Sequence, residues 1–153
     1  MTKVRMTTHF DAPIERVFDL ATDYSRLPEW NVSYAEIKQV TGPVDKVHTK
    51  VHSVMKILGR KMEGWGEVIE VDRPRYVKIS GIGDEGGKLI YSQRFTPAAP
   101  GTDLEFECEY ELPAGILGHI ADRLFVEKAV ERDLHHSMEN FKALVEAKQP
   151  VLL

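Results

Sequence analysis

The sequence contains a single cysteine, Cys108, so it cannot form an internal disulfide, and we expect a reducing, cytoplasmic compartment. It has no run of about 18 apolar residues, the length that spans a membrane, so we expect no stable membrane insertion. The opening residues, MTKVRMTTHFDAP, lack the apolar block of a secretory signal. An excess of basic charge is also missing: the net charge is −4, which argues against a nucleic-acid partner. What remains is a chain of 153 residues, 42% of them hydrophobic, which suits one domain over residues 1–153.

The first 31 residues predict one strand and two short helices. Residues 3–10 have strand character, and a helix follows in which Pro13 suits the first position and apolar residues recur at helical spacing. Residues 24–29 predict a second short helix, which Pro28 ends. Trp30 comes directly after this break, where a large aromatic side chain either plugs the core or forms a wall of a binding site.

Residues 33–112 change to a pattern of strands and turns. Six strand-like segments occur there, and all but the last are followed by turn residues such as TGP, GRK, DRPR or GDEGG. In the last segment apolar residues from Leu104 to Leu112 alternate with acidic residues from Asp103 to Glu111. One face of this strand is therefore buried, and the acidic face is solvated.

After residue 113 the apolar period becomes helical again. Ile116, Leu117, Ile120 and Leu124 form an opening stripe. Apolar residues then recur from Val126 to Val145 at spacings of three and four, which predicts one long helix over 126–146. The order of elements predicts an α+β fold, an antiparallel meander covered by one long helix.

Three segments carry a resemblance to a known family: DAPIERVFDLATDYSRLPEWN, EVIEVDRPRYVKI and RFTPAAPGTDLEFECEYEL. With the C-terminal amphipathic helix, they resemble the SRPBCC superfamily, which includes START domains and polyketide cyclase/dehydrase-like proteins, over residues 3–147. The resemblance implies a helix-grip fold, a curved seven-stranded antiparallel sheet around the long C-terminal helix, with two short helices closing one end of an apolar cavity. Trp30 would then be either a lid residue of that cavity or a structural plug.

Strand alternation predicts which side chains line such a cavity. The inward faces combine apolar side chains with a few polar ones, the composition of a small-molecule site. The predicted ligand-binding residues are Trp30, Val51, Met55, Tyr91, Gln93, Phe106, Cys108, Tyr110, Leu134 and Met138. We expect a common internal space of at least about 300 Å³. Thr49 and Ser53 also face inward, and neighbours across the sheet could satisfy any of these polar groups.

Residues that could carry chemistry are few. Tyr91, Tyr110 and Glu127 are the candidates for proton transfer, and Glu127 lies about 40° from the centre of the helix's apolar face. Cys108 has no neighbouring base in the sequence, which is typical of a small core residue. His135 and His136 point to different sides of a helix, so they do not form a metal pair, and we expect no metal and no cofactor.

Two functions of different classes fit this sequence. The favoured one is a cytoplasmic protein that binds a hydrophobic small molecule, such as a lipid, isoprenoid or polyketide-like compound, in an internal cavity. The alternative is a cyclase/aromatase- or dehydratase-like enzyme, allowed by the resemblance, in which the cavity would preorganise a flexible chain for ring closure. A protein-interaction role would require an exposed apolar surface, and no protein partner can be named from the sequence.

Overall fold

Seven strands form a single sheet in the order β1-β7-β6-β5-β4-β3-β2. The structure is a computed structural model that describes residues 1–117 and 122–147. The strands are β1 (Thr2–Phe10), β2 (Tyr34–Val40), β3 (Lys50–Ile57), β4 (Arg60–Asp72), β5 (Tyr76–Gly83), β6 (Lys88–Ala98) and β7 (Gly101–Glu111). All neighbours are antiparallel, so the predicted sheet over residues 33–112 is confirmed, and β1 joins it beside β7.

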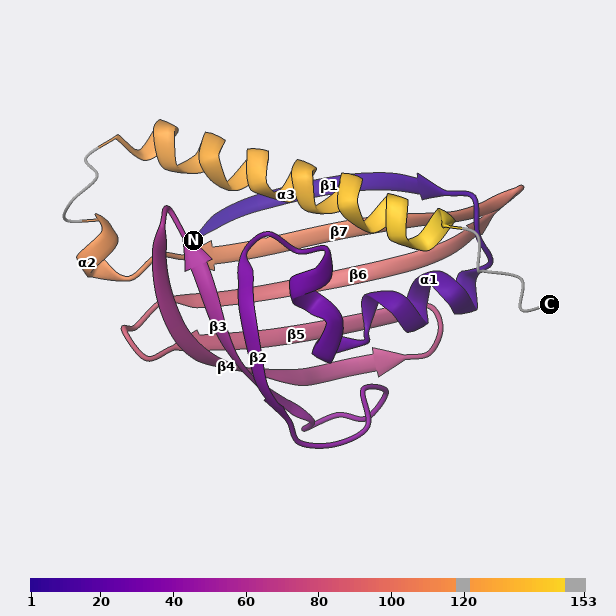
Figure 1. Cartoon of the computed structure of the whole chain (residues 1–153), viewed down its shortest axis with the longest axis horizontal. Helices are drawn as coiled ribbons and strands as arrows, with labels where there is room; N and C mark the ends of the chain where they lie inside the picture. The colour runs from indigo at the N-terminus through magenta and orange to yellow at the C-terminus, as the bar shows by residue number, and fades with distance from the viewer. Residues whose placement is uncertain (118–121, 148–153) are drawn as a thin grey trace.

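The sheet curls strongly, and irregular pairing accompanies the curl. The pairing of β2 with β3 shifts register between Tyr34 and Glu36 and again between Ile37 and Gln39, and β4 shifts against β5 near Val68. Such bulges bend a strand and increase its twist. In Figure 1, β2 and β3 run across the direction of β5, β6 and β7, so the far edge of the sheet turns back over its middle strands.

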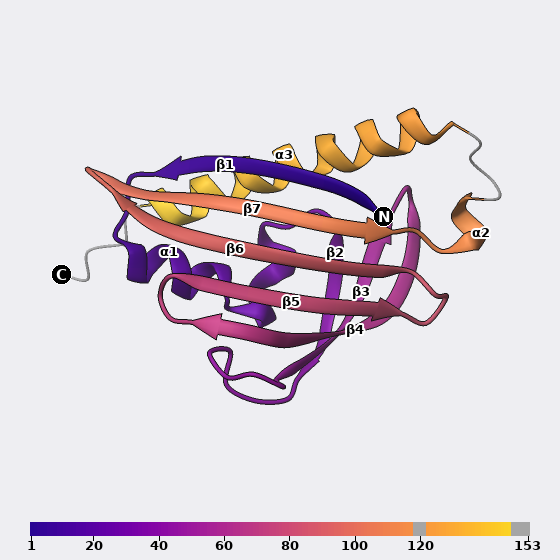
Figure 2. The same cartoon turned by 180° about the vertical axis from the view of Figure 1, so that it is seen from behind.

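Within residues 1–117 and 122–147, four helical segments accompany the sheet: α1 (Ile14–Ala21), η1 (Tyr24–Glu29), α2 (Ala114–Leu117) and α3 (Arg123–Glu146). Helix α3 begins at Arg123 rather than Val126, because the Asp122 side chain accepts hydrogen bonds from the amides of Leu124 (3.0 Å) and Phe125 (3.2 Å). Ile120, expected in the opening stripe, lies outside the described residues. Figure 2 shows β1, β7, β6 and β5 side by side with α3 behind them.

None of the helices described has both the length and the apolar composition needed to cross a membrane.

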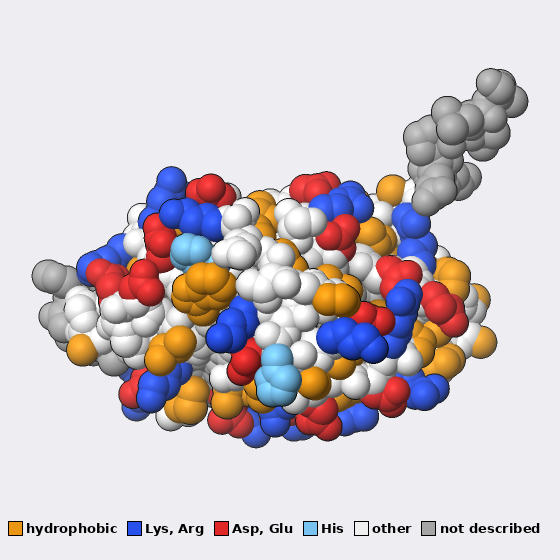
Figure 3. Space-filling model, turned by 90° about the horizontal axis from the view of Figure 1, so that it is seen from below, with side chains coloured by type: hydrophobic (Ala, Val, Ile, Leu, Met, Phe, Trp, Pro, Cys, Tyr) orange, Lys and Arg blue, Asp and Glu red, His pale blue; other side chains and the backbone are white. Residues whose placement is uncertain are grey.

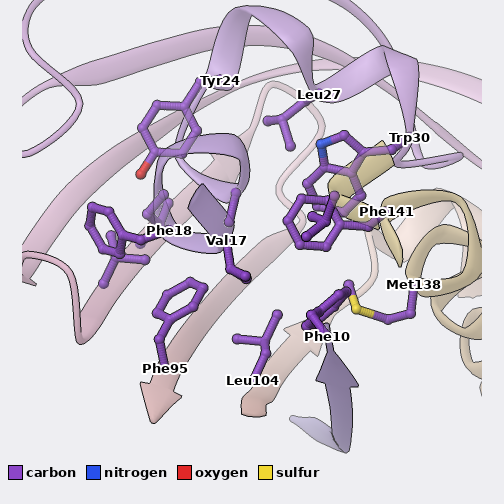
Figure 4. Close-up of a cluster of buried hydrophobic side chains, with 14 of the residues drawn as sticks. Phe10, Val17, Phe18, Tyr24, Leu27, Trp30, Phe95, Leu104, Met138 and Phe141 are labelled. Atoms are coloured by element: carbon purple, nitrogen blue, oxygen red, sulfur yellow. The ribbon is translucent and has the colours of Figure 1, made fainter. Parts of the chain in front are cut away.

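The C-terminal half of α3 is anchored in the main apolar core. Phe141 is fully buried, with ring centroids 5.3 Å from Phe10 and 4.5 Å from Trp30. Figure 4 shows these side chains converging from β1, α3 and the end of η1, with Val17 and Phe18 of α1 beside them. A second, smaller cluster lies at the other end of α3, where Val126 packs with Met62, Leu112 and Ile116.

The acidic face of β7 points outward and is paired with basic residues of β1. Glu107 accepts from Lys3 at 3.0 Å and from Arg5 at 2.9 Å. These contacts, first with Lys3 and then with Arg5, lower the pKa of Glu107. The alternating pattern of this strand therefore separates a charged exterior from an apolar interior, as predicted.

Replacing Phe141 with alanine tests the anchoring of α3. We expect Phe141→Ala to lower the free energy of unfolding by about 3–5 kcal/mol, because a fully buried aromatic side chain leaves a cavity. The measurement is urea denaturation followed by circular dichroism. Phe125→Ala is the matched control, since Phe125 on the same helix is 58% exposed and its loss should change stability by less than about 0.5 kcal/mol. A loss below about 1 kcal/mol for Phe141→Ala would contradict the packing described here.

Candidate functional site

An internal cavity of about 200 Å³ lies between α3, the end of η1 and the inner faces of the strands. Residues of both apolar clusters line it, and Leu134 of α3 contacts both clusters. Its wall is mostly apolar, with contributions from Leu27, Ile79 and Phe106. The expected common space therefore exists, but it is smaller than the expected 300 Å³. Large aromatic side chains on its wall, Trp30, Tyr34 and Tyr91 among them, take up part of the interior.

Four glycines leave one part of the cavity wall without side chains. Gly64 pairs with Gly83, and Gly66 pairs with Gly81, at inward positions of β4 and β5. We call these four residues the glycine floor. Paired residues lie about 5 Å apart and alternate residues along a strand about 7 Å apart, so the bare backbone covers roughly the area of one six-membered ring. A Cβ added at Gly66 would meet the Ile79 side chain at 3.4 Å and the Ser80 carbonyl oxygen at 4.0 Å, both ordinary contacts, so the absence of a side chain there widens the cavity rather than relieving strain.

Helix α3 presents one face to the cavity. Val130, Asp133, Leu134 and Ser137 all line it, at the spacing that places residues on one side of a helix. Asp133 is the carboxylate on this face, and its side chain is 33% exposed. Glu127 does not line the cavity. It is half-buried and lies about one helical turn before Val130, the first residue of α3 that lines the cavity.

The segment after η1 is tied to α3 by hydrogen bonds from side chains. The Val32 amide donates to the Ser137 hydroxyl at 3.0 Å, and the Asn140 side chain donates to the Trp30 carbonyl at 3.2 Å. Trp30 is 3% exposed, so it is a buried wall residue packed on Phe141 rather than a lid at the surface. These contacts fix the wall of the cavity that Trp30 and Asn31 form.

Tyr34, Tyr91 and Cys108 are weak acids on the cavity wall, and burial makes them weaker. Burial raises the pKa of Tyr34 and of Tyr91, and it raises the pKa of the Cys108 thiol to about 12. Tyr34 of β2 and Tyr91 of β6 both line the cavity although β3, β4 and β5 separate their strands, because the sheet curls. All three side chains are therefore protonated at neutral pH and can donate hydrogen bonds, but they cannot act as general bases.

Tyr110 and Glu127 do not form an acid–base pair. Burial and, after it, the nearby Glu127 carboxylate raise the pKa of Tyr110. The Tyr110 hydroxyl nevertheless makes no hydrogen bond to that carboxylate. In this geometry no proton passes directly between these two candidates.

The structure brings most of the predicted ligand-binding residues to one cavity. Trp30, Met55, Tyr91, Gln93, Phe106, Cys108, Tyr110 and Leu134 line it. Val51 and Met138 lie instead in the filled apolar core beside it. Whether these residues contact a ligand stays a prediction.

Sequence reasoning missed two features of this site. The glycine floor was visible in the sequence as Gly-Trp-Gly at 64–66 and Gly-Ile-Gly at 81–83, because alternate glycines in a strand share one face. Asp133 was visible as a carboxylate three residues after Val130 on the apolar face of the helix.

Metal ligands are not gathered in the part of the chain that the structure describes. No group of three or more His, Cys, Asp or Glu side chains is arranged there to hold an ion. His135 and His136 are both on α3, and neither lines the cavity. His52 lies outside the cavity, stacked on Trp65 with ring centroids 4.5 Å apart and hydrogen-bonded to Glu63 at 3.1 Å.

Comparison with known proteins places this fold among relatives. A family model described as polyketide cyclase / dehydrase and lipid transport matches residues 1–146. No curated protein matches the chain.

Among solved structures, a protein of Thermus thermophilus is 23% identical with a TM-score of 0.76, over 94% of this chain and 97% of that one. A START superfamily protein of Mycobacterium smegmatis is 18% identical with a TM-score of 0.73, over 94% and 97% of the two chains. The di-domain aromatase/cyclase BexL of the BE-7585A biosynthetic pathway is 14% identical with a TM-score of 0.73, over 97% of this chain and 51% of that one. At these identities the likeness concerns the fold.

The raised pKa of Cys108 predicts an unreactive thiol. At pH 8 a thiol with a pKa of about 12 is almost entirely protonated, whereas an unfolded cysteine is partly thiolate. We therefore expect a disulfide reagent such as DTNB to react with the native protein on the order of 1,000-fold more slowly than with the protein in guanidinium chloride. The absorbance of the released thiolate gives both rates, and equal rates would contradict the burial of this side chain.

Proposed function

The chain belongs to the polyketide cyclase/dehydrase and lipid transport family, within the SRPBCC superfamily, and from that premise we propose that it binds a hydrophobic small molecule in its internal cavity. Lipid, isoprenoid and polyketide-like compounds are the proposed classes of ligand. The observation that carries the proposal is the cavity itself: about 200 Å³ of mostly apolar wall, bounded by a curled sheet and a helix. An apolar cavity of about 150 Å³ is already large enough to hold benzene.

The surroundings of the cavity suit a protein that works in an aqueous compartment. Figure 3 shows acidic and basic side chains interspersed over one face of the molecule, without a large field of one sign. The single cysteine is unpaired. We place this binding protein in the cytoplasm, where free thiols persist.

Native mass spectrometry of the purified protein tests the proposal directly. We expect a mass above that of the bare chain, and extraction into organic solvent should release the bound compound for identification. Binding of N-phenyl-1-naphthylamine, an uncharged fluorescent probe of apolar cavities, gives an independent measure. A protein that carries no compound and does not bind this probe would contradict the proposal.

A side chain placed on the glycine floor should close the cavity. We expect Gly66→Leu to weaken binding of N-phenyl-1-naphthylamine at least about 10-fold, because the new side chain projects into the space that the probe needs. Glu67→Leu is the matched control, because the next residue of β4 points to the other face of the sheet and does not line the cavity. Fluorescence titration measures both affinities, and circular dichroism checks that both variants fold. Equal affinities in the two folded variants would place the probe elsewhere.

One observation supports the alternative, a cyclase/aromatase- or dehydratase-like enzyme in the same cavity. Asp133 places a carboxylate on the cavity face of α3, and the protonated Tyr91 phenol could hold a carbonyl oxygen. Intramolecular aldol condensation of heptane-2,6-dione, which gives 3-methylcyclohex-2-enone and water, is a small test reaction. Turnover above the buffer rate that Asp133→Asn abolishes would favour the enzyme, and no turnover would favour the binding protein.

A further inference from the structure

The charged residues that line the cavity gather at one end of the sheet. Lys56 and Glu63 lie on either side of the β3–β4 turn, Glu85 lies in the β5–β6 turn, Lys88 begins β6, and Glu111 ends β7. Asp133 of α3 is the other charged residue on the described wall. Apart from these six residues, the described wall of the cavity carries no charged side chain.

Gln93 lies at the opposite, closed end of the cavity. It is five residues along β6 from Lys88, a separation of roughly 17 Å along an extended strand. The next inward residues, Phe95 of β6 and Leu104 of β7, are 2% and 1% exposed and close the space beyond it. The cavity thus runs from a charged mouth to an uncharged end at which the Gln93 carboxamide lies.

The carboxamide of Gln93 is buried without a protein partner. Gln93 is 2% exposed and lines the cavity, and no hydrogen bond joins its side chain to the residues that the structure describes. Four other buried polar residues, Thr22, Thr49, Thr102 and Ser137, each hydrogen-bond to the backbone. Ser53 is the remaining one, and it too lines the cavity without a side-chain partner among the described residues.

An unpartnered amide in an apolar interior costs stability, because it has lost its hydrogen bonds to water and gained none. The other buried polar atoms without partners among the described residues, the Tyr24 and Tyr110 hydroxyls and the Trp30 Nε1, expose almost no surface. Gln93 differs from them because what remains of its accessible surface faces the cavity. A bound molecule could therefore satisfy this amide.

Building on the proposed function, we infer that Gln93 is the polar end of the binding site and that the ligand is an uncharged molecule with a carbonyl or hydroxyl oxygen directed toward it. The carboxamide can donate to a carbonyl and can both donate to and accept from a hydroxyl. An anionic head group is disfavoured there, because Lys56 and Lys88 lie at the mouth, the Gln93 end of the described wall offers no cation, and a buried carboxylate without a partner is costly. The apolar body of the ligand lies along Tyr91 and Ile79 and reaches the glycine floor toward the mouth.

The experiment compares two probes that differ in one atom position. Decan-2-one carries a carbonyl oxygen, and 2-methyldec-1-ene carries a methylene group in its place. Both are titrated against bound N-phenyl-1-naphthylamine in the wild type and in Gln93→Leu, with Gln93→Met as a second variant of matched length. We expect Gln93→Leu to weaken the binding of decan-2-one about 10-fold. The affinity for 2-methyldec-1-ene should change by less than about 2-fold.

Thermal unfolding supplies the second readout. Gln93→Leu should raise Tm by a few degrees, because it removes an unsatisfied amide from the apo protein. Thr102→Val is the matched control: it should lower Tm, since the Thr102 hydroxyl donates to the Ala12 carbonyl at 2.8 Å, and it should leave both probe affinities unchanged.

The outcomes separate this inference from the proposed function. If wild-type protein does not bind N-phenyl-1-naphthylamine, the proposed function fails, and this inference fails with it. If the probe binds but Gln93→Leu and Gln93→Met lower the affinities for the two competitors equally, the inference alone is overturned. The same holds if neither affinity changes. A fall in Tm for Gln93→Leu like that of Thr102→Val would likewise overturn it, because Gln93 would then be a structural residue.

Discussion

The packing of Phe141 against Phe10 and Trp30 holds α3 onto the sheet, and the cavity depends on that contact. It fastens the C-terminal half of the helix, while Val126 and its neighbours fasten the other end. Between these two points Val130, Leu134 and Ser137 line the cavity, and Val130 and Leu134 also pack against the apolar clusters at its sides. A helix held at both ends can span an unfilled interior without collapsing into it.

The space is kept open by what the wall lacks as much as by its shape. Side chains at Gly66 and Gly81 would project inward from β4 and β5, and a Cβ at Gly64 would meet the Ile82 carbonyl oxygen at 2.8 Å. Their absence leaves backbone that is already hydrogen-bonded within the sheet. The interior is consequently apolar and uncharged over most of its length, with neutral phenols and a neutral thiol. Such a wall recognises shape and a few hydrogen bonds rather than charge.

The fold was predictable because the spacing of apolar residues in the sequence clearly distinguishes strands from helices. The sequence did not show which inward residues lie in the packed core and which line the cavity. Alternation placed Tyr91, Gln93 and Phe106 on the inner face, and the helical period placed Phe141 against the sheet. The same alternation could not separate Val51, which is packed in the core, from Ser53, which borders the cavity, since both share one face of β3. That distinction depends on where α3 crosses the sheet. The helical wheel likewise pointed to Glu127, whereas Asp133 is the carboxylate of α3 that lines the cavity. A wheel gives the angle of a residue around the helix axis but not which turns of the helix border the cavity.

The irregular pairing of β2 has a consequence for how copies of this chain meet one another. β2 lies at the end of the strand order, so one of its sides has no neighbouring strand in the described sheet. A regular, flat edge of this kind is a template on which a second chain can add a strand and begin an aggregate. Two register shifts within seven residues, and the outward Glu36 and Lys38, deny an incoming strand a continuous ladder of hydrogen bonds. The curl that shapes a place for a small molecule therefore also makes the β2 edge a poor template for a second chain.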